Sequence, residues 1–462
     1  MFDINAIRGL RSRFRGELIT KEDGARYEST RELFNAMFDR RPALILQPLD
    51  AADVATAIGF ARETGAPLAV RCGGHSVAGY SSVDNGLVID MRAMNRVTVD
   101  VGARRARAQG GANWGEFDRE TTKYGLATTG GRVTTTGIAG LTLGSGSGWL
   151  DRLRGFTCDN LISAEVVTAD GRSVRASREE NSDLHWGLCG GGGNFGIVTE
   201  FEYQLHPIEP LVFGGMIVHR RENAAELLRL YRDFMDAAPR ELSGGVVFIT
   251  APPAPFIPPD LQGKPAVAVI VTWFGDIASG ERALKPLREF GEPVADLIQP
   301  MPYVALQSML DAGNEWGRRQ YWRSENLTEF SDAAIERLVA QANLATSPFT
   351  QIIVVPLGGA VAEVPEGGTP LGGRSARWQY HCYGGWADDN DAKHIEWVRE
   401  TERALKPYTA GHISLNFVSE ASNDRVRAAF GEATYQRLVA LKDQYDPTNL
   451  FRLNQNVLPS TR

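Results

Sequence analysis

The sequence predicts an α+β protein of two domains, the second built on a mostly antiparallel sheet backed by helices. Its 462 residues exceed the ~250–300 at which a single hydrophobic core stops growing. A strand-helix-strand pattern with dense glycine occupies the first part of the chain, and longer apolar strands separated by helices follow the run His206–Pro210. We therefore expect a first domain over residues 1–208, a second over 209–408, and a closing segment over 409–462.

Composition and charge narrow the classes of partner. Apolar residues make up 43% of the chain and charged residues 23%, which is ordinary for a globular protein. The net charge of −7 is not gathered into blocks, so neither nucleic acid nor an anionic membrane is expected as a partner. No apolar run approaches the ~18 residues of a membrane span, and the N-terminus lacks the apolar core of a signal peptide. We expect a cytoplasmic protein that acts on a small molecule, and no feature indicates its oligomeric state.

Four cysteines are scattered along the chain without CxxC or Cys/His spacing: Cys72, Cys158, Cys189 and Cys382. Disulfide frameworks and zinc sites need close, regular spacing. The sequence therefore predicts neither, and no metal is expected.

Elements of the first domain follow from apolar spacing and capping residues. A strand at 42–46 precedes a helix that Asp50 caps, with Val54, Ile58 and Ala61 on one face. The next strand, 67–70, completes a strand-helix-strand unit. Further elements expected here are strands at 87–90 and 107–109, a helix at 114–124, a hairpin of strands 161–169 and 173–176 closed by Asp170-Gly171, and a helix at 182–188.

The second domain shows a different pattern of long apolar strands and helices. The expected strands are 212–218, 244–249, 266–273, 351–357 and 377–383, and the expected helices are 222–237, 279–290, 332–343 and 392–405. One more helix is expected over 423–444. A sheet with helices on one side leaves its other face bare, so that face should cover a ligand or another domain.

A glycine turn follows the strand at 67–70, in the stretch Arg71–Tyr80 that reads RCGGHSVAGY. Gly73 and Gly74 can adopt positive φ, and the free N–H groups of such a turn form a nest for an anion such as phosphate. His75 would then lie beside the ligand. On spacing alone it could equally be a turn histidine bonded to the backbone.

Two more glycine-dense segments are Gly125–Leu150 and Gly190–Gly196. The second contains pieces of a GxGxxG dinucleotide fingerprint. Because it follows a helix and precedes a strand, which reverses the order of that motif, we reject this interpretation.

Three segments together carry a family resemblance: RCGGHSVAG at 71–79, GGGGNFGIVT at 190–199 and YDPTNLFRLNQN at 445–456. In this order they resemble the berberine bridge enzyme-like family of FAD-linked oxidases, within the vanillyl-alcohol oxidase/PCMH flavoprotein superfamily. The resemblance implies a two-domain PCMH-type FAD-binding fold whose closing segment returns to the FAD-binding domain. It also implies FAD as cofactor, joined covalently through His75 to the flavin 8α-methyl carbon.

The resemblance implies a set of cofactor-binding residues in addition to His75. They are Arg71, Cys72, Gly73, Gly74, Ser76, Val77, Gly79, Thr135, Thr136, Gly137, Gly140, Gly144, Gly148, Asn160, Gly193, Gly196, Ile197, Val198, Asn454 and Asn456. Some family members add a second link from a cysteine, but Val133 stands at that position here, so a single link is implied. Thr136 occupies a position where small side chains admit oxygen in the family, which favours an oxidase that makes hydrogen peroxide.

The catalytic base is where the chain departs from the family. Many members carry a tyrosine at the end of a YxNY motif, and Phe417 stands there in this sequence. A base should then come from the second domain. Alternation along 378–383 places Gln379, His381 and Tyr383 on one face, and Gln379 aligns with the glutamate base of plant members.

We therefore take Tyr383, His381, Gln379 and Tyr321 as candidate catalytic residues. Tyr321 and Arg323 belong to a segment that matches the YxKS run of the family, and Tyr80 is a weaker candidate. His381 could equally be a structural histidine with its nitrogens satisfied.

The leading functional hypothesis is an FAD-dependent oxidase. It would remove a hydride from a hydroxyl- or phenol-bearing small molecule, a sugar or a secondary metabolite, to flavin N5 and reduce O2 to H2O2. The alternatives are a flavin dehydrogenase that uses another electron acceptor, and a flavin-binding protein without catalysis.

Overall fold

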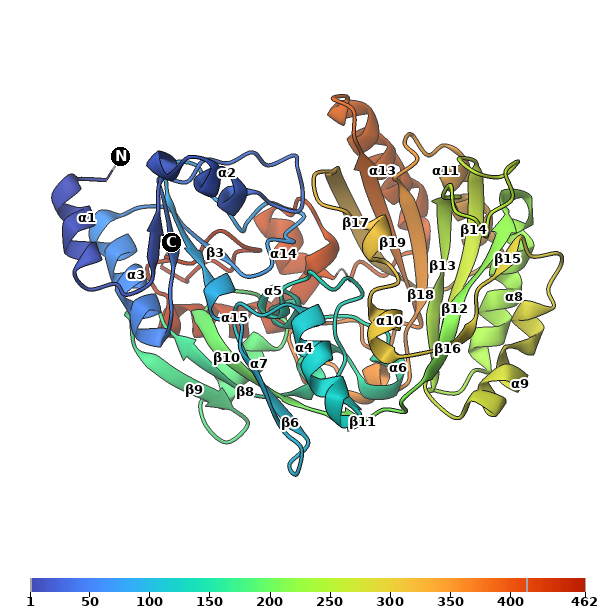
Figure 1. Cartoon of the computed structure of the whole chain (residues 1–462), viewed down its shortest axis with the longest axis horizontal. Coiled ribbons are helices and arrows are strands. Elements are labelled where there is room, and N and C mark those ends of the chain that lie inside the picture. The colour runs from blue at the N-terminus through green and yellow to red at the C-terminus, as the bar shows by residue number, and fades with distance from the viewer. Residues whose placement is uncertain (1, 413, 462) are drawn as a thin grey trace.

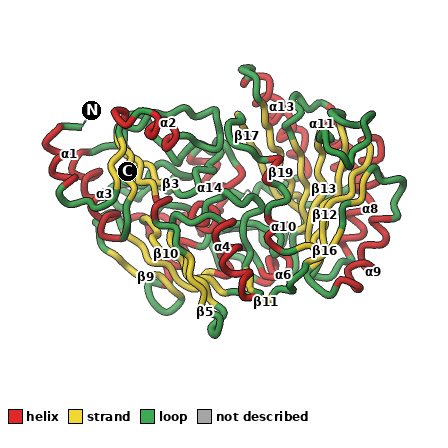
Figure 2. Tube along the Cα trace, viewed as in Figure 1, coloured by secondary structure: helices red, strands yellow, loops and turns green. Residues whose placement is uncertain are grey.

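Two lobes lie side by side in the computed structural model, which describes residues 2–412 and 414–461 (Figure 1). Both chain ends lie on the first lobe. Figure 2 shows that strands gather in two places in the first lobe and in one large sheet in the second. The α+β class predicted from the sequence is confirmed.

The first sheet of the first lobe contains the expected strand-helix-strand unit. Its strand order is β1 (Glu17–Ile19), β2 (Leu44–Gln47), β4 (Leu87–Asp90), β3 (Leu68–Arg71). β2 and β3 both pair in parallel with β4, and helix α3 (Ala51–Thr64) connects them. Asp50 caps α3 as predicted, because its carboxylate accepts hydrogen bonds from the backbone N–H groups of Ala52 at 3.0 Å and Asp53 at 3.1 Å.

The second sheet of this lobe is antiparallel. Its order is β5 (Val97–Asp100), β6 (Arg105–Gln109), β10 (Ile197–Gln204), β8 (Leu161–Val167), β9 (Ser173–Ser177). The predicted hairpin is β8–β9. A short pair joins β7 (Leu126–Ala127) to β11 (His206–Pro207), and the helices are α1 (Ile4–Arg11), α2 (Ala25–Arg31), α4 (Trp114–Thr121), α5 (Ile138–Leu143), α6 (Asp151–Arg154) and α7 (Ser182–Leu188).

An eight-stranded antiparallel sheet forms the second lobe. Along it run β15 (Ala295–Asp296), β12 (Val212–Arg220), β14 (Pro265–Trp273), β13 (Leu242–Thr250), β18 (Gln351–Pro356), β19 (Trp378–Trp386) and β17 (Arg319–Leu327), while β16 (Gln299–Met301) also pairs with β12. Its outer face is covered by α8 (Ala224–Asp236), α9 (Ile277–Arg288), α11 (Asp332–Asn343) and α13 (Asp391–Leu405), as Figure 1 shows. Two short helices complete the lobe, α10 (Tyr303–Gln307) and α12 (Ala360–Glu363).

β17 is a strand that the sequence analysis did not predict. It pairs with β19 in antiparallel register, with Trp322 opposite Tyr383 and Tyr321 opposite Gly384. Its residues, RQYWRSENL, are mostly polar or charged and do not alternate with apolar side chains, so apolar periodicity is a weak signal there. This pairing decides which side chains of 319–327 face the first lobe.

The single helix expected over 423–444 is wrong. Two helices stand there, α14 (Asn423–Phe430) and α15 (Glu432–Tyr445), because Gly431 takes a φ of +75° between them. Both pack on the first lobe: Phe430 and Leu438 belong to the same hydrophobic core as Trp114 and Phe201. The end of the chain therefore returns to the first lobe.

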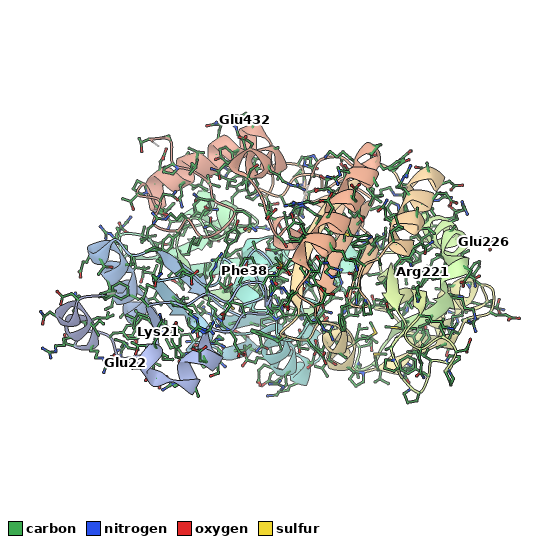
Figure 3. All side chains as sticks on the ribbon, turned by 90° about the horizontal axis from the view of Figure 1, so that it is seen from above. Lys21, Glu22, Phe38, Arg221, Glu226 and Glu432 are labelled. Atoms are coloured by element: carbon green, nitrogen blue, oxygen red, sulfur yellow. The ribbon has the colours of Figure 1, made fainter. Side chains whose placement is uncertain are left out.

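The N-terminal segment also ties the lobes together. The Asn35 amide is fully buried and its Nδ2 donates to the carbonyl oxygens of Val77 at 2.9 Å and Gln320 at 2.8 Å, so one side chain holds the glycine turn against β17. In Figure 3 Phe38 lies near the middle of the molecule, whereas Glu226 and Glu432 lie on the outer surface. None of the described helices is long and apolar enough to cross a membrane.

Candidate active site

A large cavity lies between the two lobes. The inner face of the eight-stranded sheet forms one wall, and the glycine-dense segments of the first lobe form the other. Most of the predicted cofactor residues line it: Cys72, Gly73, Gly74, His75, Ser76, Val77, Thr136, Gly137, Gly140, Gly144, Gly193, Gly196, Ile197, Val198 and Asn454. Four segments far apart in the chain thus meet at one cavity.

Glycine is required where two of these segments touch. A Cβ on Gly73 would lie 2.3 Å from the backbone nitrogen of Gly137, and a Cβ on Gly137 would lie 2.2 Å from that of Gly73. Side chains cannot fit at such distances. At Gly140 and Gly193, by contrast, a Cβ would meet nothing within 4 Å, and both residues line the cavity. The glycines therefore form a cradle of backbone that leaves room for an extended ligand.

Two polar side chains at or beside the cradle have buried atoms without a hydrogen-bond partner among the described residues. Arg71 is only 2% exposed, and its Nε and Nη2 have no hydrogen-bond partner within the described part of the chain. Burial lowers the pKa of Arg71 to about 10, so it stays positively charged at neutral pH. Asn454 lines the cavity and its Oδ1 also lacks a partner among the described residues. A cation beside the turn at Gly74 suits the pyrophosphate of a dinucleotide.

Three predicted cofactor residues instead make close contacts inside the protein. They are Gly79 against the Phe38 ring, Gly148 against the Gly130 carbonyl, and Asn160, whose Oδ1 accepts a hydrogen bond from His206 at 2.7 Å. Asn456 differs from these three residues, because its Oδ1 is buried and has no hydrogen-bond partner in the described ranges. Gly79, Gly148 and Asn160 are therefore explained by packing of the first lobe.

His75 is held on three sides. Its Nε2 lies 2.8 Å from the Thr135 hydroxyl, and its ring stacks on Phe34 with centroids 4.2 Å apart and planes 16° apart. Trp316 meets the ring edge-on at 5.7 Å. Burial, aided by the charge of Arg71, lowers the pKa of His75 to about 3, so the imidazole is neutral. Thr135 therefore contributes to the predicted cofactor site by orienting the His75 ring.

Two of the predicted catalytic residues face the cavity from β19, as alternation predicted. His381 is 1% exposed, and neither ring nitrogen has a hydrogen-bond partner among the described residues. Its ring meets Phe417 edge-on at 4.5 Å, and burial lowers its pKa to about 3. The Tyr383 ring lies 4.2 Å from that of Trp322, and burial raises the pKa of its phenol. At neutral pH both groups are uncharged.

Gln379 shares the strand face but not the cavity. It lines a separate small cavity with Ser145 and Arg374. Its Nε2 donates to Asn326 Oδ1 at 2.8 Å, so its amide is already engaged by β17. The face predicted from alternation is therefore divided between two cavities.

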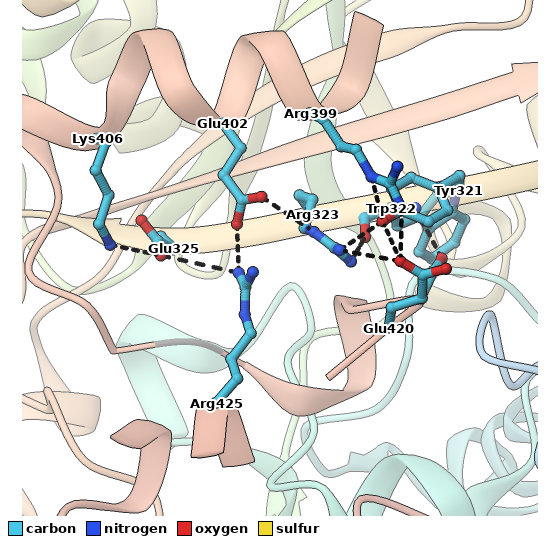
Figure 4. Close-up of polar contacts among 10 residues, drawn as sticks. Tyr321, Trp322, Arg323, Glu325, Arg399, Glu402, Lys406, Glu420 and Arg425 are labelled. Carbon is cyan, nitrogen blue, oxygen red and sulfur yellow. Dashed lines mark hydrogen bonds and ion pairs between the residues drawn. The ribbon is translucent and has the colours of Figure 1, made fainter. Parts of the chain in front are cut away.

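Tyr321 lies on the opposite face of the sheet from His381. Its hydroxyl donates to Glu420 at 2.7 Å and accepts from Arg399 at 3.3 Å, between α13 and the segment that follows Phe417 (Figure 4). Arg323 lies beside it and pairs with Glu402 at 3.2 Å. Alternation along β17 explains this placement, since Trp322 takes the cavity side. Tyr321 and Arg323 thus join the closing segment to the second lobe.

Among the cavity residues that sequence reasoning missed are Phe34, Trp322 and Arg132. Phe34 lies in the polar N-terminal segment, which shows no apolar periodicity. Trp322 lies on β17, the strand that the sequence analysis did not predict. Arg132 did carry a signal, because it is the only charged residue between Gly125 and Leu150. A charge in a segment otherwise made of glycine, threonine and apolar residues calls for a partner.

Known proteins match this chain in sequence. A family model described as FAD binding domain matches residues 42–177, and one described as berberine and berberine like matches residues 412–458. An FAD-linked oxidoreductase of Dictyostelium discoideum is 30% identical over 90% of this chain and 89% of its own length. The (R)-6-hydroxynicotine oxidase of Paenarthrobacter nicotinovorans is 31% identical over 96% of this chain and 97% of its own length.

Solved structures agree with these matches. The structure of 6-hydroxy-D-nicotine oxidase from Arthrobacter nicotinovorans is similar with a TM-score of 0.84, at 28% identity and over 96% of this chain and 98% of that one. A berberine bridge enzyme-like protein of Physcomitrella patens shares the fold with a TM-score of 0.86, at 20% identity and over 98% of this chain and 99% of that one.

A PCMH-type two-domain fold with an FAD cradle between its lobes defines a flavin-dependent oxidoreductase. The chain belongs to the berberine bridge enzyme-like family of FAD-linked oxidoreductases. The family, the fold and the cofactor type predicted from the sequence are thereby confirmed.

We predict that Gly140→Leu abolishes FAD binding while the protein still folds. The leucine would project into the open space of the cradle and displace the cofactor, since its Cβ meets no protein atom within 4 Å. The flavin-to-protein absorbance ratio of the purified variant should fall at least about tenfold, the effect of a modest steric penalty. Gly59→Leu in α3 is the matched control, since a Cβ there also meets nothing within 4 Å. Normal flavin content in Gly140→Leu would refute the cradle.

Proposed function

We propose that the protein is an FAD-linked oxidase with a single covalent link through His75. Its substrate is a hydroxyl- or phenol-bearing small molecule, a sugar or a secondary metabolite, and O2 is the electron acceptor. Bound FAD supplies the hydride acceptor. The observation that supports this most is the continuity of one cavity from the cradle around His75 to His381 and Tyr383 on β19.

Covalent attachment is supported by how His75 is held. Thr135 engages Nε2, so Nδ1 is the ring nitrogen left for the flavin. The lowered pKa keeps the ring neutral, and in the tautomer whose Nε2–H donates to the Thr135 hydroxyl the lone pair is on Nδ1. Phe34 and Trp316 restrict the ring to one orientation. Such restriction lowers the entropy cost of forming the bond. Val133 lines the cavity where a second link would need a cysteine.

Oxygen as the acceptor is supported by the same segment. Thr136 lines the cavity and carries a small side chain, which leaves space for O2 beside the cradle. The (R)-6-hydroxynicotine oxidase relative is itself named an oxidase. Its substrate, a hydroxylated heterocycle, is therefore included among the compounds to test.

The proton of the substrate hydroxyl passes to His381 in this proposal. A neutral imidazole whose two nitrogens have no partner in the described structure can accept a hydrogen bond from that hydroxyl and then its proton. Tyr383 cannot take this role at neutral pH, because its raised pKa keeps the phenol protonated. It can donate a hydrogen bond and orient the substrate beside Trp322.

We expect His75 to hold the flavin after denaturation. Wild-type protein precipitated by acid should stay yellow, whereas the His75→Ala pellet should be colourless with any flavin in the supernatant. His412→Ala, which replaces a histidine outside the cavity lining, should behave as wild type. A colourless wild-type pellet would contradict the covalent link.

Removal of the proton acceptor should slow flavin reduction. Anaerobic stopped-flow should show a ~10²–10⁴-fold loss in His381→Asn, and a loss of about tenfold or less in Tyr383→Phe, the value of one hydrogen bond. Gln379→Leu is the control and should react at nearly the wild-type rate. Because the pKa of His381 lies at about 3, kcat/KM should stay level between about pH 5 and pH 8. A histidine inflection in that range, absent from His381→Asn, would contradict the lowered pKa, and a loss of less than about tenfold in His381→Asn would overturn its assignment as the proton acceptor.

A peroxide-coupled screen tests the oxidase itself. Sugars, alcohols, phenols and 6-hydroxynicotine are offered to the purified protein in air, and turnover should release H2O2 in proportion to substrate. Mixing substrate-reduced enzyme with O2 should restore the oxidised flavin spectrum within seconds. Reoxidation that takes minutes, together with fast transfer to an artificial dye, would identify a dehydrogenase instead.

A further inference from the structure

Arg132 is the one charged residue of the Asp, Glu, Lys and Arg types among the described residues that line the cavity. It lies in the loop that follows α4 and β7, directly before Val133. The facing wall on the sheet is mostly apolar or aromatic, with Ile270, Ile353 and Trp322 as examples, and its polar side chains, such as Gln351, are uncharged. A lone cation in such a wall costs desolvation free energy unless a partner of opposite charge or strong hydrogen-bond acceptors compensate it.

Four contacts hold the guanidinium in place. Its Nη1 donates to the Ser147 hydroxyl at 3.0 Å and its Nη2 to the Gly148 carbonyl at 2.7 Å. Nη2 also lies 3.3 Å from an Asp151 carboxylate oxygen, and the Trp149 ring lies 4.9 Å from the guanidinium carbon. The head group is therefore fixed before any ligand binds, which reduces the entropy cost of recognition.

These contacts leave part of the charge and part of the donor set unused. Arginine has five N–H donors, and Nε is buried without a hydrogen-bond partner in the described ranges. Asp151 is a weak counter-ion, since its contact with Arg132 is single and long and burial raises its pKa to about 6. Its two oxygens already accept from the Ser147 hydroxyl and the Gly148 backbone N–H.

The positive charge of Arg132 affects His381 and Tyr383, the two residues of β19 that are proposed to act on the substrate. Arg132 lines the same cavity as His381 and Tyr383, and its charge lowers the pKa of both. The aromatic rings of Trp322, Tyr383 and Phe417 lie nearby as one wall, with centroids 4.2 to 6.4 Å apart. A flat ring with an anionic oxygen would match the aromatic wall and the cation together.

We propose that Arg132 determines substrate specificity by binding an oxyanion, a carboxylate or phenolate, carried on an aromatic substrate whose ring packs on Trp322, Tyr383 and Phe417. This proposal rests on the proposed function, in that the cavity beside the flavin is taken as the substrate site. It narrows the substrate class from hydroxyl-bearing molecules in general to aromatic acids and acidic phenols.

Isothermal titration calorimetry of the holoenzyme at pH 8 tests the proposal with two matched pairs of probes. Benzoate is compared with benzamide, and 4-nitrophenolate with 4-nitroaniline, so each pair differs mainly in charge. Hydrogen bonds to a charged group predict that at least one anion binds ~10–100-fold more tightly than its neutral partner. Preference for benzoate alone assigns a carboxylate, and preference for 4-nitrophenolate alone assigns a phenolate.

Variants distinguish a role of Arg132 in recognising the anion from a purely structural role. Arg132→Met should remove the preference for the anion and leave binding of the neutral probe nearly unchanged, and Arg132→Lys should restore part of the preference. Arg119→Met, on the exposed face of α4, removes the same charge from the protein and should keep the full preference. Asp151→Asn removes the counter-ion and should strengthen binding of the anion but not of the neutral probe.

Two results would overturn the proposal: neutral probes that bind as tightly as anions to the wild type, or an anion preference that survives in Arg132→Met. If Arg132→Met does not fold, Arg132→Lys and Asp151→Asn test the proposal instead. An unchanged preference for the anion in both variants is evidence against the proposal. Binding is measured without turnover. A protein that prefers anions yet makes no peroxide would refute the oxidase and keep this assignment, whereas a peroxide-producing enzyme without anion preference would do the reverse.

Discussion

The backbone contact between Gly73 and Gly137 is the constraint on which the active site depends. Neither position admits a Cβ, because each would fall within 2.3 Å of the other loop's backbone nitrogen. This contact brings the loop that carries His75 against the loop that carries Thr135 and Thr136. The hydrogen bond between His75 and Thr135 and the open cradle at Gly140 both follow from it, and so does the position of Arg132 a few residues before the contact.

The second lobe contributes through the two faces of a single sheet. Side chains of β19 that point outward pack on the helices, and those that point inward reach the cavity. Side chains of β17 also alternate between the two faces of the sheet. Trp322 faces the cavity, whereas Tyr321 and Arg323 lie on the other face and enter an ionic network with Glu420 and Glu402. That network anchors the segment just after Phe417. The aromatic wall of the cavity is therefore supported from behind by charged contacts that the cavity itself lacks.

Charge is scarce inside the cavity, and this shapes its chemistry. Burial keeps His75 and His381 neutral and Tyr383 protonated, so these groups act through hydrogen bonds and through a free imidazole nitrogen. Arg132 is the one charged residue of the Asp, Glu, Lys and Arg types among the described residues that line the cavity, and the buried Arg71 lies beside the cradle at Gly74. The position of Arg71 suits the pyrophosphate of the cofactor, and Arg132 is proposed to bind an anionic oxygen of the substrate.

The sequence by itself determined the α+β class, and its three motifs carried the family resemblance that implied FAD and most of the cradle residues, because motifs whose glycines touch another backbone or leave room for a ligand are visible in the chain. Alternation along 378–383 also placed His381 and Tyr383 correctly on the inner face. Only the tertiary structure decided that Gln379 belongs to a different cavity, that Tyr321 faces the helices, and that Phe34 and Arg132 reach the site. These placements depend on which strand pairs with which and on contacts between residues hundreds of positions apart, and local periodicity contains no information about either.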